Sequence, residues 1–148
     1  MLPSDDVIRK HCDRIIQTIN SCGFTYHNGI RITKLDLDYC EGELDITPEC
    51  LNPLGIVHGG CLAALADTVG GMAAVSRGKG TVTVNYGFSF LRQAKGTKIK
   101  CVATPEKVGK SISVFRCVLT DDQDELVASG QFTFHMIDID FTKDLKEN

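Results

Sequence analysis

The stretch between Glu49 and Arg77 constrains the fold most, because it contains a single formally charged residue, Asp67. After a turn-like sequence around Pro53, small and aliphatic residues continue as far as Val75, over a length typical of a central helix. A helix that faces solvent normally carries charged side chains on its outer side. This helix must therefore be covered on more than one side, although its apolar run is too short for a membrane span, which needs about 20 residues.

The two faces of this helix differ in bulk when side chains are placed at 100° per residue. The bulky face, which we expect to pack on a sheet, carries Cys61, Leu62, Leu65, Val69 and Met72. The bare face carries Gly60, Ala63, Ala64, Asp67, Gly70, Gly71 and Ala74. An interior glycine costs about 0.8–1.0 kcal/mol of helix stability relative to alanine. The bare face therefore favours a dimer interface over a helix sandwiched between two layers of one domain.

The flanking segments predict a single α+β domain over residues 1–148. Apolar spacing predicts an N-terminal helix over about residues 4–22 and strands between 30 and 46 and near 81–91, 97–106, 112–120 and 126–137. The alternation changes parity near Thr33, which indicates a bulge. Short turns between successive strands predict an antiparallel sheet in a core of about residues 26–137. The charged tail, 138–148, is expected to fray.

Composition and charge exclude several classes of protein. The seven cysteines are expected to be reduced thiols, because their number is odd and no Cys-x-x-Cys pair indicates a zinc site. The first residues lack the basic segment and the apolar segment of a signal peptide, which predicts a cytoplasmic protein. From Phe90 to Val118 the chain carries +6, whereas the remainder carries −9. A single basic tract in an otherwise acidic protein argues against general nucleic-acid binding, although it could bind a small polyanion. The alternative is that its lysines only prevent the sheet edges from pairing with other chains.

Asp67 and the Gly59-Gly60 pair have the chemistry of two halves of a hydrolytic site. One turn away, Asp67 has only alanine and glycine neighbours, so its carboxylate lacks a counter-charge. The first amides of a helix have no intrahelical acceptor, and glycine lets a ligand carbonyl approach them as an oxyanion hole. His58 would brace this loop or bond the reacting group. The ordinary alternatives are a solvated aspartate and a plain helix start.

The two halves cannot meet within one chain. Eight residues separate Gly59 from Asp67, which corresponds to roughly 12 Å of helix rise. Two antiparallel helices related by a two-fold axis would place each Asp67 beside the other chain's Gly59. The spacing therefore predicts a homodimer.

The pattern Asn52-x-x-Gly55-x-x-His58-Gly59-Gly60, followed by Ala66-Asp67, resembles the phenylacetate-pathway (PaaI-like) branch of the hotdog-fold acyl-CoA thioesterases. The similarity covers about residues 44–136, including Val82-x-Val84-Asn85-Tyr86 and Lys107-x-Gly109-Lys110-Ser111. It implies an antiparallel sheet wrapped around a long helix, dimers that commonly pair into homotetramers, and hydrolysis of acyl-CoA thioesters. No cofactor or metal is implied, because coenzyme A is part of the substrate.

The resemblance also implies a role for each matching residue. Asp67 resembles the catalytic carboxylate, as general base or nucleophile, and Gly59 the amide that polarises the thioester carbonyl. His58 would position that end of the site, Asn52 would hold substrate or water, and Thr83 would lie near the attacking water. We expect Thr83 on the opposite side of its strand from Val82, Val84, Tyr86, Phe88 and Phe90. The expected substrate contacts are Gly60, Asn85, Phe90, Lys107, Gly109, Lys110, Ser111 and His135.

Three alternatives remain open. A hotdog-fold enoyl-CoA hydratase shares the Asn-Pro-Leu stretch, but Cys50 and Gly55 occupy the positions of its aspartate and histidine. A non-catalytic acyl-CoA-binding module would keep the fold without turnover, although Asp67 is retained. Cys61 would be a nucleophile at a helix start, where the thiol pKa is lowered, but its place on the bulky face favours a buried structural thiol.

Overall fold

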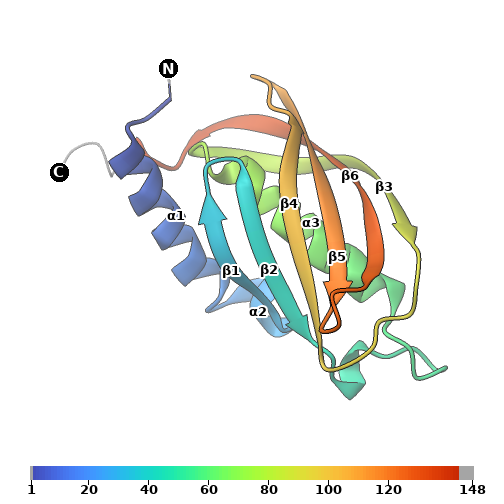
Figure 1. Cartoon of the computed structure of the whole chain (residues 1–148). Helices are drawn as coiled ribbons and strands as arrows, with labels where there is room; N and C mark the ends of the chain where they lie inside the picture. Colours follow the sequence, from blue (N-terminus) through green and yellow to red (C-terminus); the bar gives the residue numbers. More distant parts are fainter. Residues whose placement is uncertain (1, 144–148) are drawn as a thin grey trace.

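The computed structural model describes residues 2–143, and Figure 1 shows its order of helices and strands. Helices α1 (Asp5–Ile19) and α2 (Gly23–His27) precede strands β1 (Ile30–Asp36) and β2 (Tyr39–Asp45). A short turn of 3-10 helix, η1 (Pro48–Cys50), leads into the long helix α3 (Gly59–Val75). Strands β3 (Lys79–Phe90), β4 (Lys98–Lys107), β5 (Ile112–Asp121) and β6 (Leu126–Asp140) follow. The predicted α+β class and the N-terminal helix are confirmed.

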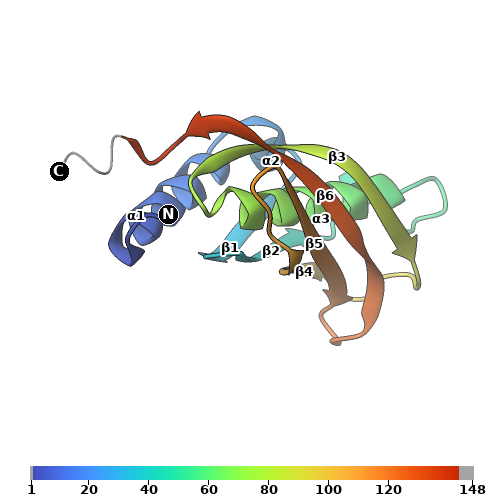
Figure 2. The same cartoon turned by 90° about the horizontal axis from the view of Figure 1, so that it is seen from above.

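The six strands form one antiparallel sheet in the order β1-β2-β4-β5-β6-β3. Helix α3 lies along the concave face of this sheet (Figures 1 and 2) and contacts every strand. The pairing of β1 with β2 shifts register between Ile32 and Lys34, which is the bulge predicted near Thr33. The architecture of a sheet wrapped around a central helix is therefore confirmed, with β1 and β3 as its edges.

Much of the glycine-rich side of α3 is buried within the chain, contrary to the predicted bare face. Gly70, Gly71 and Ala74 are buried. A Cβ on Gly70 would lie 3.1 Å from both Cys117 Sγ and Phe134 Cζ, so the glycine lets β5 and β6 approach the helix closely. The prediction was wrong for this half of the helix because the curved sheet covers more than one side of it. The residues of that face which remain at least partly exposed are Gly60, Ala63, Ala64 and Asp67.

The end of β6 is more ordered than its charge predicts. The strand runs to Asp140, and Thr142 is buried, with its backbone N–H and hydroxyl donating to Asp140 Oδ1 at 2.8 and 2.6 Å. The expected fraying is therefore wrong for residues 138–143, because hydrogen bonds hold this segment. The rest of the expected tail, 144–148, lies outside the described residues.

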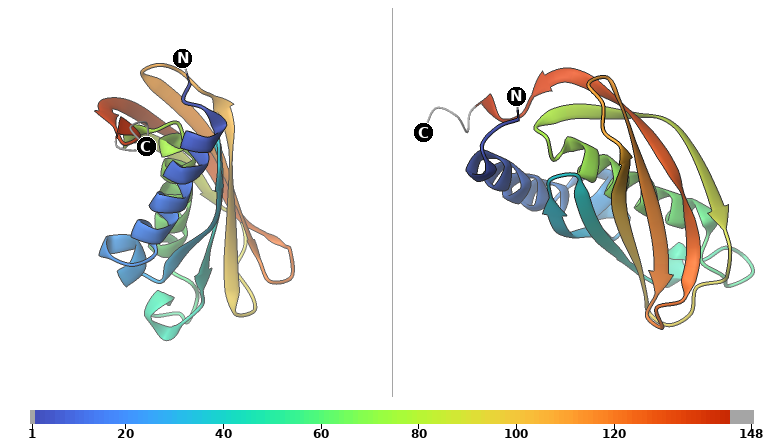
Figure 3. Two further views of the ribbon diagram at one scale, coloured as in Figure 1. Left: turned by 90° about the vertical axis from the view of Figure 1, so that its left-hand side faces the viewer. Right: turned by 45° about the horizontal axis from the view of Figure 1, so that its top comes forward.

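Helix α1 lies on the same side of the sheet as α3, as the left view of Figure 3 shows. Its buried residues Ile8 and Cys12 belong to the hydrophobic core, and Ile15, Ile16 and Ile19 pack against that core. Within residues 2–143, no helix combines the length and the apolar character needed to cross a membrane.

Candidate active site

The loop before α3 is shaped by Asn52. Its Oδ1 accepts hydrogen bonds from the backbone N–H groups of Leu54 (2.9 Å) and Ile56 (3.2 Å), and its own N–H donates to Ile56 O (2.8 Å). Gly55 has a φ of +73°, in the left-handed region that glycine adopts without strain. The carboxamide oxygen of Asn52 therefore holds the turn that aims the start of α3.

His58 is the N-cap residue of α3, and its side chain accepts a hydrogen bond from one of the two glycine N–H groups. Its Nδ1 accepts from Gly60 N–H at 2.8 Å, and its backbone oxygen accepts from Cys61 N–H at 2.9 Å. The N–H of Gly59 has no acceptor within residues 2–143, so it is available at the positive end of the helix dipole. The predicted amide of Gly59 is thus unoccupied, whereas that of Gly60 is bonded to His58.

Phe90, at the end of β3, lies against the start of α3. A Cβ on Gly59 would be 3.2 Å from Phe90 Cε1, so a larger residue would crowd this amide. A cavity of about 360 Å³ adjoins the same point and is lined by Gly59, Phe90 and the loop after β3. The geometry leaves room for a ligand at the open amide end.

Asp67 contacts Thr83, which lies on the edge strand β3. Thr83 Oγ1 donates to Asp67 Oδ1 at 2.7 Å. Asp67 is half-buried, and no Lys, Arg or His of the described chain forms an ion pair with it. A hydroxyl therefore holds one carboxylate oxygen, and the other can accept a hydrogen bond from a water molecule or substrate.

A bulge at Val84 changes which side chains share a face with Thr83. Thr83 pairs with Phe134, and after the register shift Tyr86 pairs with Phe132; both phenylalanines are buried. Directly paired residues of antiparallel strands lie on the same face. Thr83 and Tyr86 therefore both face α3, and the Tyr86 ring stacks on Phe132 at 4.8 Å between centroids. The predicted separation of Thr83 from the aromatic residues after it was wrong, because one extra residue reverses the alternation.

The two predicted halves of the site are present in one chain, but they lie apart. Gly59 and Asp67 belong to one continuous helix, so roughly 12 Å of rise separates them. Strand β3 runs past both, with Thr83 beside Asp67 and Phe90 beside Gly59.

Most of the predicted coenzyme A contacts cluster at the turn between β4 and β5. Ile112 pairs with His135, and Met136 N–H donates to Ser111 O at 2.8 Å, so this turn lies beside β6. His135 also pairs with Val82, the residue before Thr83, and therefore lies on the opposite face of the sheet from Asp67. One chain does not bring this group together with Asp67. Its members are Lys107, Gly109, Lys110, Ser111 and His135, whereas Asn85 lies on β3, where it pairs with Thr133.

Internal ion pairs neutralise part of the basic tract. Arg92 pairs with Asp121, Lys98 with Glu43, and Arg116 with Glu106. Lys107 and Lys110 are exposed, and neither forms an ion pair in the part of the chain that the structure describes. These two lysines are therefore available to an anionic ligand.

Asp121 supports the cavity beside Gly59 and was missed by the sequence analysis. It is fully buried, and its Oδ2 accepts from Arg92 (2.7 Å) and from the backbone of Lys95 (3.1 Å), which anchors the loop after β3. Although burial opposes the charge, backbone N–H donors and Arg92 hold the pKa of Asp121 below its usual value. In the sequence it stands in an acidic hairpin tip, which gives no sign of burial.

Five of the seven cysteines are buried, whereas Cys22 is exposed and Cys61, which was expected to be buried, is half-buried. All seven, which lie within the described residues, are free thiols. Burial raises the pKa of Cys61, which favours the thiol over the nucleophilic thiolate. Among residues 2–143, no group of three His, Cys, Asp or Glu side chains is placed to hold a metal ion.

Solved structures share this fold. A thioesterase from Haemophilus influenzae has a TM-score of 0.78 at 26% identity, over 88% of this chain and 91% of that one. The PaaI protein of the E. coli phenylacetic acid degradation operon has a TM-score of 0.82 at 23% identity, over 92% of this chain and 97% of that one. At this identity the likeness to PaaI concerns the fold alone, and it confirms the expected hotdog architecture.

Sequence comparisons identify the family. An esterase-named protein of Mycobacterium tuberculosis is 33% identical over 109 residues, covering 70% of this chain and 78% of that protein. The proofreading thioesterase EntH of Cronobacter turicensis is 30% identical over 100 residues, covering 66% of this chain and 73% of that protein. The profile of the thioesterase superfamily matches residues 54–128, which include Asp67, Thr83 and the start of α3. The chain therefore belongs to the thioesterase superfamily, a family of thioester hydrolases.

Proposed function

We propose that this protein hydrolyses acyl-CoA thioesters to a free acid and coenzyme A. The observation that carries the proposal is the contact of Asp67 with Thr83, which holds a carboxylate without a counter-charge beside an exposed strand. Asp67 would accept a proton from water as its oxygen attacks the thioester carbonyl carbon. The carbon–sulfur bond of the tetrahedral intermediate then breaks, and the sulfur of coenzyme A leaves as a thiol after taking up the proton that Asp67 had accepted.

The carbonyl oxygen would be stabilised by the Gly59 amide of a second copy. This amide lies at the start of α3 and is unoccupied within the described chain. Because one helix separates its own Gly59 from Asp67 by roughly 12 Å, each site needs one residue from each subunit.

Strand β3 offers the surface on which two copies would meet. It is an edge strand, and its outward apolar residues include Val82, 49% exposed, and Val84, 59% exposed. An unpaired, apolar edge is a template for pairing with another chain. Antiparallel pairing about an axis between Tyr86 and Gly87 would set Thr83 opposite Phe90 of the partner subunit.

This register would complete the site on both sides of the axis. Within one chain, Thr83 contacts Asp67 and Phe90 contacts Gly59. Setting Thr83 opposite Phe90 of the partner subunit would therefore bring the Asp67 end of one site to the Gly59 end of the other. Each Asp67 would then lie beside Gly59 of the partner subunit. Pairing of dimers into tetramers, a cytoplasmic location and binding of the coenzyme A phosphates by Lys107 and Lys110 belong to the same proposal.

Release of free thiol from acetyl-, octanoyl- and phenylacetyl-CoA tests the proposed activity. Asp67→Asn should lower kcat by about 10²–10⁴-fold, the usual contribution of a general base, while coenzyme A still binds. Asp13→Asn is the matched control, because Asp13 is an exposed aspartate on α1. Unchanged turnover in Asp67→Asn would contradict the role of the carboxylate, and no thiol release by the unaltered protein would contradict the function.

A further inference from the structure

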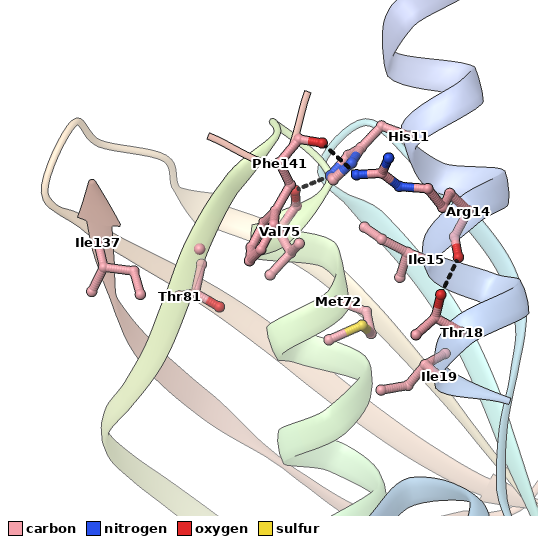
Figure 4. Close-up of a pocket in the computed structure, with 11 residues that line it drawn as sticks. His11, Arg14, Ile15, Thr18, Ile19, Met72, Val75, Thr81, Ile137 and Phe141 are labelled. Atoms are coloured by element: carbon pink, nitrogen blue, oxygen red, sulfur yellow. Dashed lines mark hydrogen bonds between the residues drawn. The ribbon is translucent and has the colours of Figure 1, made fainter. Parts of the chain in front are cut away.

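An apolar groove of about 440 Å³ lies between α1 and the C-terminal half of α3 (Figure 4). Ile15 and Ile19 line it from α1, and Met72 and Val75 line it from α3. Ile137 of β6 lines the side nearer the sheet. A volume within the range of about 300–1,000 Å³ and a lining of aliphatic side chains are typical of ligand pockets.

The polar groups around this groove are largely satisfied by the chain itself. Arg14 donates to Phe141 O at 2.8 Å, and Thr18 Oγ1 donates to Arg14 O at 2.9 Å, both shown in Figure 4. His11 Nε2 lies 3.0 Å from Val75 O, and its Nδ1 is buried without a hydrogen-bond partner within residues 2–143. Apart from this one ring nitrogen, these polar groups are bonded within the chain, and the aliphatic walls of the groove suit an apolar group.

The groove is lined in part by the two elements that carry Asp67 and Thr83, helix α3 and strand β3. Thr81 lines it and lies two residues before Thr83 on β3. Thr81 pairs with Met136 and Thr83 with Phe134, both buried, so the two threonines share the face toward α3. Met72 follows Asp67 on the same helix. The near end of the groove is therefore set off from Asp67 by roughly 7.5 Å of helix rise, and the groove extends from there toward α1.

We propose that this groove binds the acyl group of the substrate and selects aliphatic chains of medium length. The proposal rests on the proposed function, since it places the thioester at Asp67 and the chain beyond it. An apolar chain gains free energy for each methylene that it buries in such a groove. The kcat/KM should therefore rise about fourfold per added methylene until the groove is filled.

Filling the groove from its exposed rim tests the proposal. Thr18 is exposed on α1 and lines the groove, so Thr18→Trp should place a ring in the path of the chain without disturbing the core. The preference for octanoyl-CoA over acetyl-CoA should fall roughly tenfold or more, the loss expected from about two buried methylenes. Gln17→Trp is the matched control, because Gln17 is exposed on the same helix and does not line the groove. An unchanged preference in Thr18→Trp, or an equal change in Gln17→Trp, would overturn the proposal.

Binding of S-octyl-coenzyme A, a thioether that cannot be hydrolysed, separates this inference from the proposed activity. Calorimetry should show weaker binding to Thr18→Trp than to Gln17→Trp, with both folded by circular dichroism. If the unaltered protein releases no thiol but shows this difference, the proposed function fails and the groove assignment stands. Absence of thioether binding to the unaltered protein overturns the assignment. A change in molar mass by light scattering in Thr18→Trp with binding unchanged would instead identify the groove as an interface between copies, and would also overturn it.

Discussion

The hydroxyl of Thr83 donates a 2.7 Å hydrogen bond to the carboxylate of Asp67, which joins the middle of helix α3 to the edge strand β3. The same strand lies against Gly59 through Phe90. The orientation of Asp67 therefore depends on a strand whose outer edge is unpaired in the single chain. Catalysis and assembly are linked through this strand in the proposed dimer.

Replacing Thr83 tests whether its hydroxyl orients the carboxylate. Thr83→Val keeps the branched shape and removes the donor, so kcat should fall about 10–100-fold, since a hydrogen bond to a charged group contributes about 1.5–3 kcal/mol. Thr83→Ser should restore most of the rate in steady-state thiol-release assays, because it restores the donor. A Thr83→Val variant with the rate of the unaltered protein would show that the bond has no part in turnover.

A charge on the exposed edge of β3 should separate the proposed dimer. Val84→Asp places a carboxylate on each copy at the proposed interface, where pairing of the edges would remove its water without supplying a counter-charge. Light scattering should show monomers, and thiol release should fall in proportion to the lost dimer. The control is Leu37→Asp, because Leu37 is also exposed but lies between β1 and β2. A monomeric Val84→Asp variant with full activity would contradict the shared site.

Removal of the two unpaired lysines should weaken binding of coenzyme A rather than slow the chemical step. Lys107→Ala combined with Lys110→Ala should raise the KM for acyl-CoA several-fold, because exposed ion pairs contribute up to about 1 kcal/mol each. The effect should grow at low salt, where such interactions are less screened. Lys100→Ala provides the control from the same basic tract, since Lys100 is exposed on β4. A loss confined to kcat would argue against phosphate binding.

The buried histidine of α1 should make stability depend on pH. Burial, only partly offset by the hydrogen bond to Val75 O, lowers the pKa of His11 below its ordinary value. Below about pH 6.5, the ordinary pKa of a histidine in the unfolded chain, the unfolded chain therefore binds protons that the folded chain excludes, and the free energy of unfolding falls as the pH falls. Above this pH the contribution of His11 is fully present.

Urea unfolding at pH 7, 6 and 5 measures this dependence. His11→Gln keeps a donor for Val75 O and should flatten the loss of stability over this pH range. His135→Gln, at an exposed position, should leave the slope unchanged. The same slope in His11→Gln as in the unaltered chain would assign the dependence to other groups.

The pattern of residues along the chain was sufficient to predict the local elements and the two halves of the site. Helix α3, the four strands after it and the bulge near Thr33 follow from apolar periodicity, which reports how each segment alternates between core and solvent. The single charge of Asp67 and the glycines at the start of α3 are equally visible without coordinates. Spacing along one helix was also sufficient to show that these halves lie apart.

The way in which neighbouring elements cover the surface of α3 could not be predicted from the sequence, because it depends on how distant segments pack. Curvature of the sheet buried Gly70, and the bulge at Val84 turned Tyr86 to the same side as Thr83. The groove exists because α1 and α3, far apart in sequence, line its two sides. Periodicity describes each segment alone, whereas the position of a bulge and the space between two helices depend on which surfaces pack together.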